Sequence, residues 1–168
     1  MKTIMKISNY FILLLSAIVM ISCGQSSTKS ELAEEAKSEE VNETVSAILT
    51  AYFDVKEALV NDDASKAQEA ANAMLAVTGT YAEALNLHVK NIAASDDIEA
   101  QRITFEILSI NIYALAITEN AGITVYKQFC PMAFDDKGAF WLSDNKQILN
   151  PYFGASMLRC GRVEETIN

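Results

Sequence analysis

Apolar residues recur at steps of three and four residues from Val45 to Ile117, and this spacing constrains the fold more than any other feature of the sequence. Steps of this length place apolar side chains on one face of an α-helix, which a folded chain buries against its neighbours. Two short polar segments with paired aspartates, residues 61–63 and 95–97, interrupt the pattern, and aspartate is a favoured helix N-cap. The spacing therefore predicts helices over about residues 45–60, 64–92 and 96–119.

Three details refine the predicted helices. Gly79 lies inside the second helix and marks a kink or a break into two helices. Asp96, followed three residues later by Glu99, resembles a capping box at the start of the third helix. That helix has two apolar faces, which predicts that it is the most buried helix of the set. One face carries Phe105, Leu108, Ile112 and Leu115, and the other carries Ile103, Ile107, Ile110 and Ile117.

The chain changes character after Gly122. Residues 123–134 and 138–143 are rich in β-branched and aromatic residues, and the turn sequence Asp-Asp-Lys-Gly separates them. This arrangement is typical of a β-hairpin. The sequence of residues 150–161 predicts a turn followed by one helical turn. We therefore expect an all-α fold, a three- or four-helix bundle with a small C-terminal β-hairpin or loop packed on it.

The N-terminal residues indicate export. Lys2 and Lys6 precede an apolar run of 12 residues, which has the length of a signal peptide and is too short to span a bilayer. The run ends at Ser22 and Cys23, which resembles the lipobox of bacterial lipoproteins and implies cleavage before Cys23 and lipid attachment to it. The alternative is an ordinary secretory signal with Cys23 as a bystander. We expect a signal peptide over 1–22, a flexible tether over 23–40, and a domain over 41–168 with its tail at 123–163.

The charge of the chain limits its partners. The net charge is −9, and the first 22 residues hold lysines but no acid, so the remainder is more acidic still. An acidic surface is a poor ligand for nucleic acid or anionic lipid. It suits a body held at a membrane by lipid on Cys23, in the periplasmic part of the cell envelope. Gln25, rather than aspartate, stands second after Cys23, which favours the outer membrane over the inner one.

Four sulfur-containing residues in the tail are the main functional candidates. Cys130 and Met132 lie two residues apart, and Met157 and Cys160 lie three apart. Each pair would share a face in a strand or a helical turn, respectively. If the two segments meet, their thiolates and thioethers form a donor set suited to Cu(I) or Ag(I). The alternative is a Cys130–Cys160 disulfide, which an oxidising compartment favours and which would staple an irregular tail.

The tail also carries a longer pattern. It consists of Cys-Pro-Met-Ala at 130–133, Gly-Ala-x-Trp-Leu-Ser at 138–143, Asn-Pro-Tyr-Phe-Gly at 150–154 and Met-Leu-x-Cys-Gly at 157–161. This pattern resembles an uncharacterised domain family of Bacteroidetes-type bacterial lipoproteins. A similar segment lies at the end of some adaptor proteins of heavy-metal efflux pumps. The resemblance covers about residues 45–165 and implies handling of copper or silver, with an efflux adaptor as a partner. Phe129 departs from the pattern, because similar sequences often carry histidine there.

The remaining candidates carry weaker signals. His88, the only histidine, lies on an apolar stripe and is either a core residue or an extra metal ligand. An aromatic group in the tail is either a lid on the core or a docking patch for a partner, and it comprises Phe140, Trp141, Tyr152 and Phe153. No phosphate loop, zinc-finger spacing or oriented nucleophile appears, so we expect no enzymatic activity. The two functions that remain are soft-metal binding and a disulfide-stapled module that docks an efflux adaptor or another envelope protein.

Overall fold

The computed structural model describes residues 27–79, 83–119 and 121–168. Its elements are α1 (Ser27–Val60), α2 (Ala64–Thr78), α3 (Glu83–Ala94), α4 (Ile98–Thr118), β1 (Val125–Cys130), α5 (Ala133–Asp136), β2 (Ala139–Ser143), the short 3₁₀ helix η1 (Gly154–Ser156) and β3 (Arg162–Ile167). One compact unit runs from Glu40 to Asn168 and contains the candidate site. The predicted signal peptide and Cys23 lie outside the described residues. Within the described residues, no helix is both long and apolar enough to cross a membrane.

Apart from the start of α1, the helices begin and end close to where the sequence predicts. Asp63 caps α2 by accepting a hydrogen bond from the Lys66 backbone N–H at 2.9 Å. The chain breaks into two helices at Gly79, whose φ of 47° lies in the left-handed region. The residue that caps α4 is Asp97, which accepts from the Glu99 N–H, so the predicted capping box at Asp96 is wrong. Helix α1 begins at Ser27, inside the stretch expected to be a tether.

The tail forms a three-stranded antiparallel sheet in the order β2-β1-β3. The predicted hairpin is present as β1 and β2, which pair from Tyr126 opposite Ser143 to Cys130 opposite Ala139. The third strand, β3, was not predicted. It pairs with β1 from Val125 opposite Ile167 to Phe129 opposite Arg162, and half-buried residues alternate along it with exposed ones.

Strand β1 is shorter than predicted. It ends at Cys130 because Pro131 has no N–H with which to continue the ladder. A tight turn follows, in which Phe134, Asp135 and Asp136 all have positive φ values. Residues 131–132 are a turn and residues 133–134 lie in α5, so the expected extended conformation of residues 131–134 is wrong.

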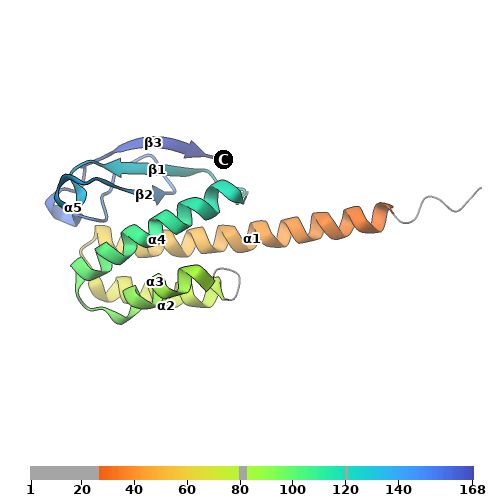
Figure 1. Ribbon diagram of the computed structural model, residues 1–168, viewed down its shortest axis with the longest axis horizontal. Coiled ribbons are helices and arrows are strands. Elements are labelled where there is room, and N and C mark those ends of the chain that lie inside the picture. The colour runs from red at the N-terminus through yellow and green to blue at the C-terminus, as the bar shows by residue number, and fades with distance from the viewer. Residues whose placement is uncertain (1–26, 80–82, 120) are drawn as a thin grey trace, which may run out of the picture. The chain divides into compact units, whose positions relative to one another are not determined.

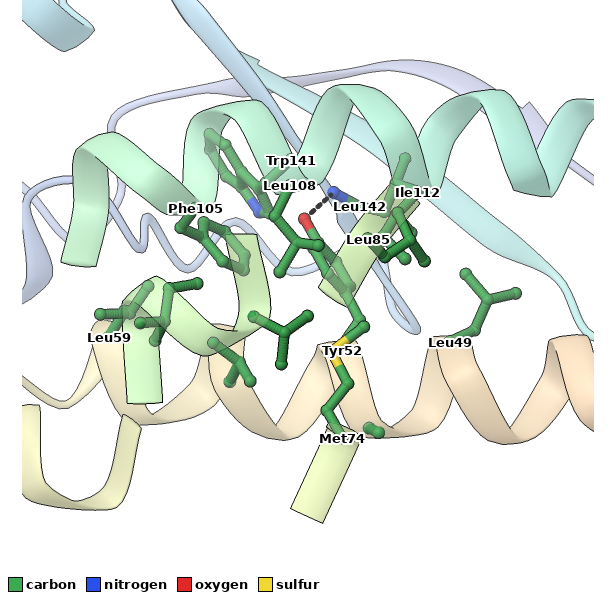
Figure 2. Close-up of a cluster of buried hydrophobic side chains, with 14 of the residues drawn as sticks. Leu49, Tyr52, Leu59, Met74, Leu85, Phe105, Leu108, Ile112, Trp141 and Leu142 are labelled. Atoms are coloured by element: carbon green, nitrogen blue, oxygen red, sulfur yellow. Dashed lines mark hydrogen bonds between the residues drawn. The ribbon is translucent and has the colours of Figure 1, made fainter. Parts of the chain in front are cut away.

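The core joins the sheet to the helices. Helix α4 packs against α3 and against β2, so it lies between the sheet and the α2–α3 pair (Figure 1). Figure 2 shows Tyr52 rising from α1 through this core, where its hydroxyl accepts the Leu142 N–H at 3.1 Å. Its ring stacks on Phe105 with centroids 4.9 Å apart, and its hydroxyl lies 2.7 Å from the Ser109 hydroxyl. One buried side chain thus connects α1, α4 and β2.

The second apolar face of α4 is not buried. Phe105, Leu108 and Ile112 are fully buried, as expected for the first face. The isoleucines of the other face are between 42% and 55% exposed, so the prediction that α4 is buried on both faces is wrong. Helix α3 and the sheet flank α4 and leave this stripe uncovered by any residue that the structure describes.

Candidate functional site

The structure brings Cys130 and Cys160 together. Cys130 ends β1, and Cys160 lies two residues before β3, the strand that pairs with β1. Their thiols are neighbours, and the hydrogen bond between them helps to raise the pKa of Cys160. Both cysteines are free thiols. Cys130 is fully buried, and Cys160 is half-buried at the outer side of the pair.

The surroundings of Cys160 favour its protonated form. Burial raises the pKa of the Cys160 thiol to about 11, and the neighbouring Cys130 thiol acts in the same direction. A hydrogen bond from the Met132 backbone N–H acts against this rise. Cys160 is therefore a thiol at neutral pH and a poor nucleophile, since reactive cysteines have lowered pKa values.

Each methionine residue adjoins Cys160 through the backbone. Met132 donates its N–H to the Cys160 thiol, and the Met157 carbonyl accepts the Cys160 N–H at 3.0 Å. The expected extended geometry is wrong for Met132, which lies in a turn with φ −93° and ψ −8°. Met157 follows η1 and begins a turn that its hydrogen bond with Cys160 closes. The Met132 side chain is 48% exposed, and that of Met157 is half-buried.

The tail motif has a structural explanation around Cys160. The Asn150 side-chain amide donates to the Cys160 carbonyl at 2.8 Å and accepts the Tyr152 N–H at 2.8 Å. Gly161 has a φ of 146°, and a Cβ atom there would lie only 2.9 Å from the Trp141 ring and 3.1 Å from the Phe129 carbonyl. Asparagine and glycine at these two positions fix the backbone on either side of the Cys160 thiol.

Arg102 and Asp62 hold the tail on the helices, and sequence reasoning missed both. Arg102 is 5% exposed. Its Nε donates to the Pro151 carbonyl at 2.9 Å, and its other nitrogens reach Glu99, the Leu59 carbonyl and Asp62. Asp62 also accepts the Ala155 N–H at 2.9 Å, and that hydrogen bond, together with Arg102, lowers the pKa of its carboxyl. The sequence offered one signal for a buried ion pair, which is that Arg102 stands three residues before Phe105, on the buried face of α4.

The aromatic group is a lid on the core. Trp141 and Tyr152 are buried, and the Tyr152 hydroxyl donates to the Phe140 carbonyl at 2.5 Å. Phe140 and Phe153 are half-buried. The docking alternative is therefore wrong for Trp141 and Tyr152, whose rings are enclosed and stand edge to face with centroids 5.9 Å apart.

His88 is not part of the cysteine site. It is half-buried on α3, and α3 packs against α2 and α4, on the side of α4 away from the sheet (Figure 1). In the part of the chain that the structure describes, no group of three or more His, Cys, Asp or Glu side chains could hold a metal ion. Metal binding therefore requires the methionines or a site with two thiolates.

Comparison with known proteins identifies one family. Residues 48–123 match the family described as "Protein of unknown function (DUF3347)". The match covers α2, α3, α4 and part of α1, and it ends before β1. The resemblance to an uncharacterised domain family is thus confirmed for the helical part, while the tail motif lies outside the match. No curated protein and no solved structure matches the chain.

Proposed function

For a chain whose residues 48–123 match this uncharacterised family, we propose that the function is the binding of a soft monovalent metal ion, Cu(I) or Ag(I). Cys130 and Cys160 are the two central ligands. The observation that carries the proposal is the meeting of these two thiols, from residues 30 positions apart in the chain, at the end of β1. The metal is cargo, for storage or for delivery to an efflux adaptor.

The donor chemistry suits such an ion. Thiolate and thioether sulfurs select soft metals such as Cu(I), and Met132 and Met157 adjoin Cys160 through its backbone and thiol contacts. Met132 has an exposed side chain that is free to turn toward an entering ion. Both cysteines must lose a proton to become thiolates, so binding releases protons and strengthens as pH rises. The raised pKa of Cys160 makes this competition with protons pronounced at neutral pH.

The same adjacency is also the geometry from which a disulfide forms. Oxidation of the two thiols removes both thiolates and abolishes metal binding at this site. The protein would then be a stapled module that docks an efflux adaptor or another envelope protein. An oxidising compartment favours this outcome, so the redox state of the native protein decides between the two functions.

A metal titration of the reduced protein tests the proposal. We expect the full chain in detergent micelles to bind one equivalent of Cu(I) or Ag(I), measured by competition with a chromophoric chelator. Trp141 is the only tryptophan and packs against Gly161 next to Cys160, so its fluorescence should change up to one equivalent and then stop. Protein with alkylated thiols is the control and should bind none. A thiol count of zero in protein purified without reductant, with a melting temperature that falls on reduction, would instead support the stapled docking module.

We further propose that lipid on Cys23 anchors the protein in the cell envelope, on the outer membrane. The support is the sequence Met-Ile-Ser-Cys at residues 20–23, after a 12-residue apolar run. Cys23→Ala should abolish incorporation of labelled palmitate and move the protein from the detergent phase to the aqueous phase, because several acyl chains give a durable anchor. Equal partitioning of wild type and variant would exclude this anchor.

A further inference from the structure

The exposed face of α4 carries apolar residues in a regular order. Its stripe consists of Ala100, Ile103, Ile107, Ile110, Ala114 and Ile117. The steps alternate between three and four residues, which is the spacing of the a and d positions in a coiled coil. The four isoleucines are between 42% and 55% exposed. A row of half-exposed isoleucines on one helix is the kind of surface to which another helix can bind.

We propose that this stripe is the interface through which two copies of the chain pair, with their α4 helices antiparallel. The stripe is self-complementary in that orientation. When Ile107 packs beside Ile110 of the second copy, the same register places each alanine opposite an isoleucine, Ala114 against Ile103 and Ala100 against Ile117. Every layer then pairs an isoleucine with an isoleucine or with an alanine. A parallel pair in register would stack alanine on alanine in two layers and leave them underfilled.

The charges beside the stripe complement each other in the same register. Glu106 and Tyr113 lie on one flank of the stripe, seven residues apart, or about 10 Å along the helix axis. Lys127 lies over the Tyr113 ring, with its Nζ 4.5 Å from the centroid. Neither Glu106 nor Lys127 forms an ion pair with the described residues. The antiparallel register brings Glu106 of each copy to Tyr113 and Lys127 of the other, so two opposite-charge pairs form by symmetry. The Glu165 carboxylate, which accepts the Tyr113 hydroxyl at 2.8 Å, is a like charge at the same place and offsets part of this attraction.

The other flank of the stripe is uncharged, and its side chains donate hydrogen bonds within α4. Thr104, Asn111 and Thr118 each donate to the carbonyl four residues earlier in α4, at 3.0, 2.8 and 2.9 Å respectively. Side chains with their hydrogen bonds made locally lose little when water is removed. This flank can therefore meet its copy in the second chain with only the remaining amide groups of Asn111 left to pair across the interface.

The size of the stripe sets the expected strength. It spans about 25 Å of helix at 1.5 Å per residue, which is a small interface beside the roughly 800 Å² per partner of a typical stable complex. We therefore expect a dissociating dimer with a Kd in the range of about 1–100 μM. Sedimentation equilibrium of the full chain in density-matched detergent micelles measures it.

Substitutions on and off the stripe test the interface. Ile110→Asp should abolish the dimer, raising Kd by at least about 100-fold, because it places a carboxylate in a central layer. Leu87→Asp is the matched control, since Leu87 is 63% exposed on α3 and lies off the stripe, and its dimer should persist. A monomer at every concentration up to about 1 mM, or a dimer that survives Ile110→Asp, would overturn the proposal.

A charge exchange tests the register. Glu106→Lys should weaken the dimer by about tenfold, and the double variant Glu106→Lys with Lys127→Glu should restore it, because both pairs re-form with reversed sign. Circular dichroism melts check that each variant is folded. A double variant no tighter than Glu106→Lys alone would exclude the antiparallel arrangement.

Discussion

Replacement of Arg102 by methionine should destabilise the protein by about 2–4 kcal/mol, because it removes charge-assisted hydrogen bonds and leaves a buried carbonyl without its donor. Arg102 is 5% exposed and donates to two carbonyls from distant parts of the chain, those of Leu59 and Pro151. Methionine fills a similar volume but leaves the Pro151 carbonyl without its donor, and a buried unsatisfied carbonyl is costly. The Leu59 carbonyl still accepts the Asp62 N–H at 3.3 Å. Urea unfolding followed by circular dichroism measures the change.

Arg162→Met is the matched control for this prediction. Arg162 pairs with Glu164 at 2.7 Å, but its side chain is 60% exposed, and exposed ion pairs contribute little to stability. Its removal should change the free energy of unfolding by less than about 0.5 kcal/mol. Equal losses in the two variants would show that Arg102 does not hold the tail on the helices.

The pH dependence of stability gives a second measurement of the same contact. The Ala155 N–H and Arg102 lower the pKa of Asp62 below its ordinary value of 3.8. A carboxyl whose pKa is lowered on folding contributes stability that is present above the unfolded pKa and is lost as pH falls through the folded pKa. The difference in stability between wild type and the Arg102 variant should therefore be constant above pH 5 and should shrink below about pH 4.

The helical part of the fold could be predicted because its signals are local. Each helix buries a stripe that repeats every three or four residues, and aspartates and a glycine mark the ends. Periodicity identifies an apolar face, but it does not show what covers that face. This is why the second face of α4 was expected in the core, whereas Ile103 and Ile110 are at least half exposed.

The tail was predicted only in part. Strand β1 and its hairpin partner have the β-branched and aromatic residues of buried strands. Strand β3, with the sequence Arg-Val-Glu-Glu-Thr-Ile, is an edge strand rich in charged residues, and such strands are hard to distinguish from a polar terminus. Pro131 should have ended the predicted strand at Cys130, since a proline cannot donate to the ladder.

The candidate site combines residues that the sequence singled out with others that it did not. Rare cysteines in a short tail are conspicuous, and the pairing of β1 with β3 brings them together. The roles of Arg102 and Asp62 were not predicted, because their hydrogen bonds join segments that are distant in the chain. Asn150 stands in the tail motif, but the motif does not show that its side chain bonds the backbone of Cys160 and Tyr152. A single polar residue forms no periodic pattern in the sequence from which such a contact could be predicted.

The cysteines should dominate metal affinity, and the methionines should modulate it. We expect Cys160→Ser to weaken Cu(I) or Ag(I) binding by more than about 100-fold, since even the loss of a residue that only supports a ligand typically costs 10- to 100-fold. Met132→Leu should weaken binding by about tenfold and leave stability almost unchanged, because its side chain is 48% exposed and the exchange nearly conserves volume. Met157→Leu should also weaken metal binding. Chelator competition gives the affinities, and urea melts give the stabilities.

Met74→Leu is the matched control for the methionine exchanges. Met74 is fully buried in α2, in the helical pair away from the sheet (Figure 1), so the same chemical change there should leave metal affinity unaltered. If the double variant of Met132 and Met157 binds as tightly as wild type while Cys160→Ser does not, the site uses two thiolates alone. Unchanged affinity in Cys160→Ser would exclude the metal function. The disulfide alternative predicts a different result. Cys160→Ser should then melt at a lower temperature than unreduced wild type and should match reduced wild type in stability, and neither protein should bind metal. That outcome would identify the cysteine pair as a disulfide that stabilises the fold.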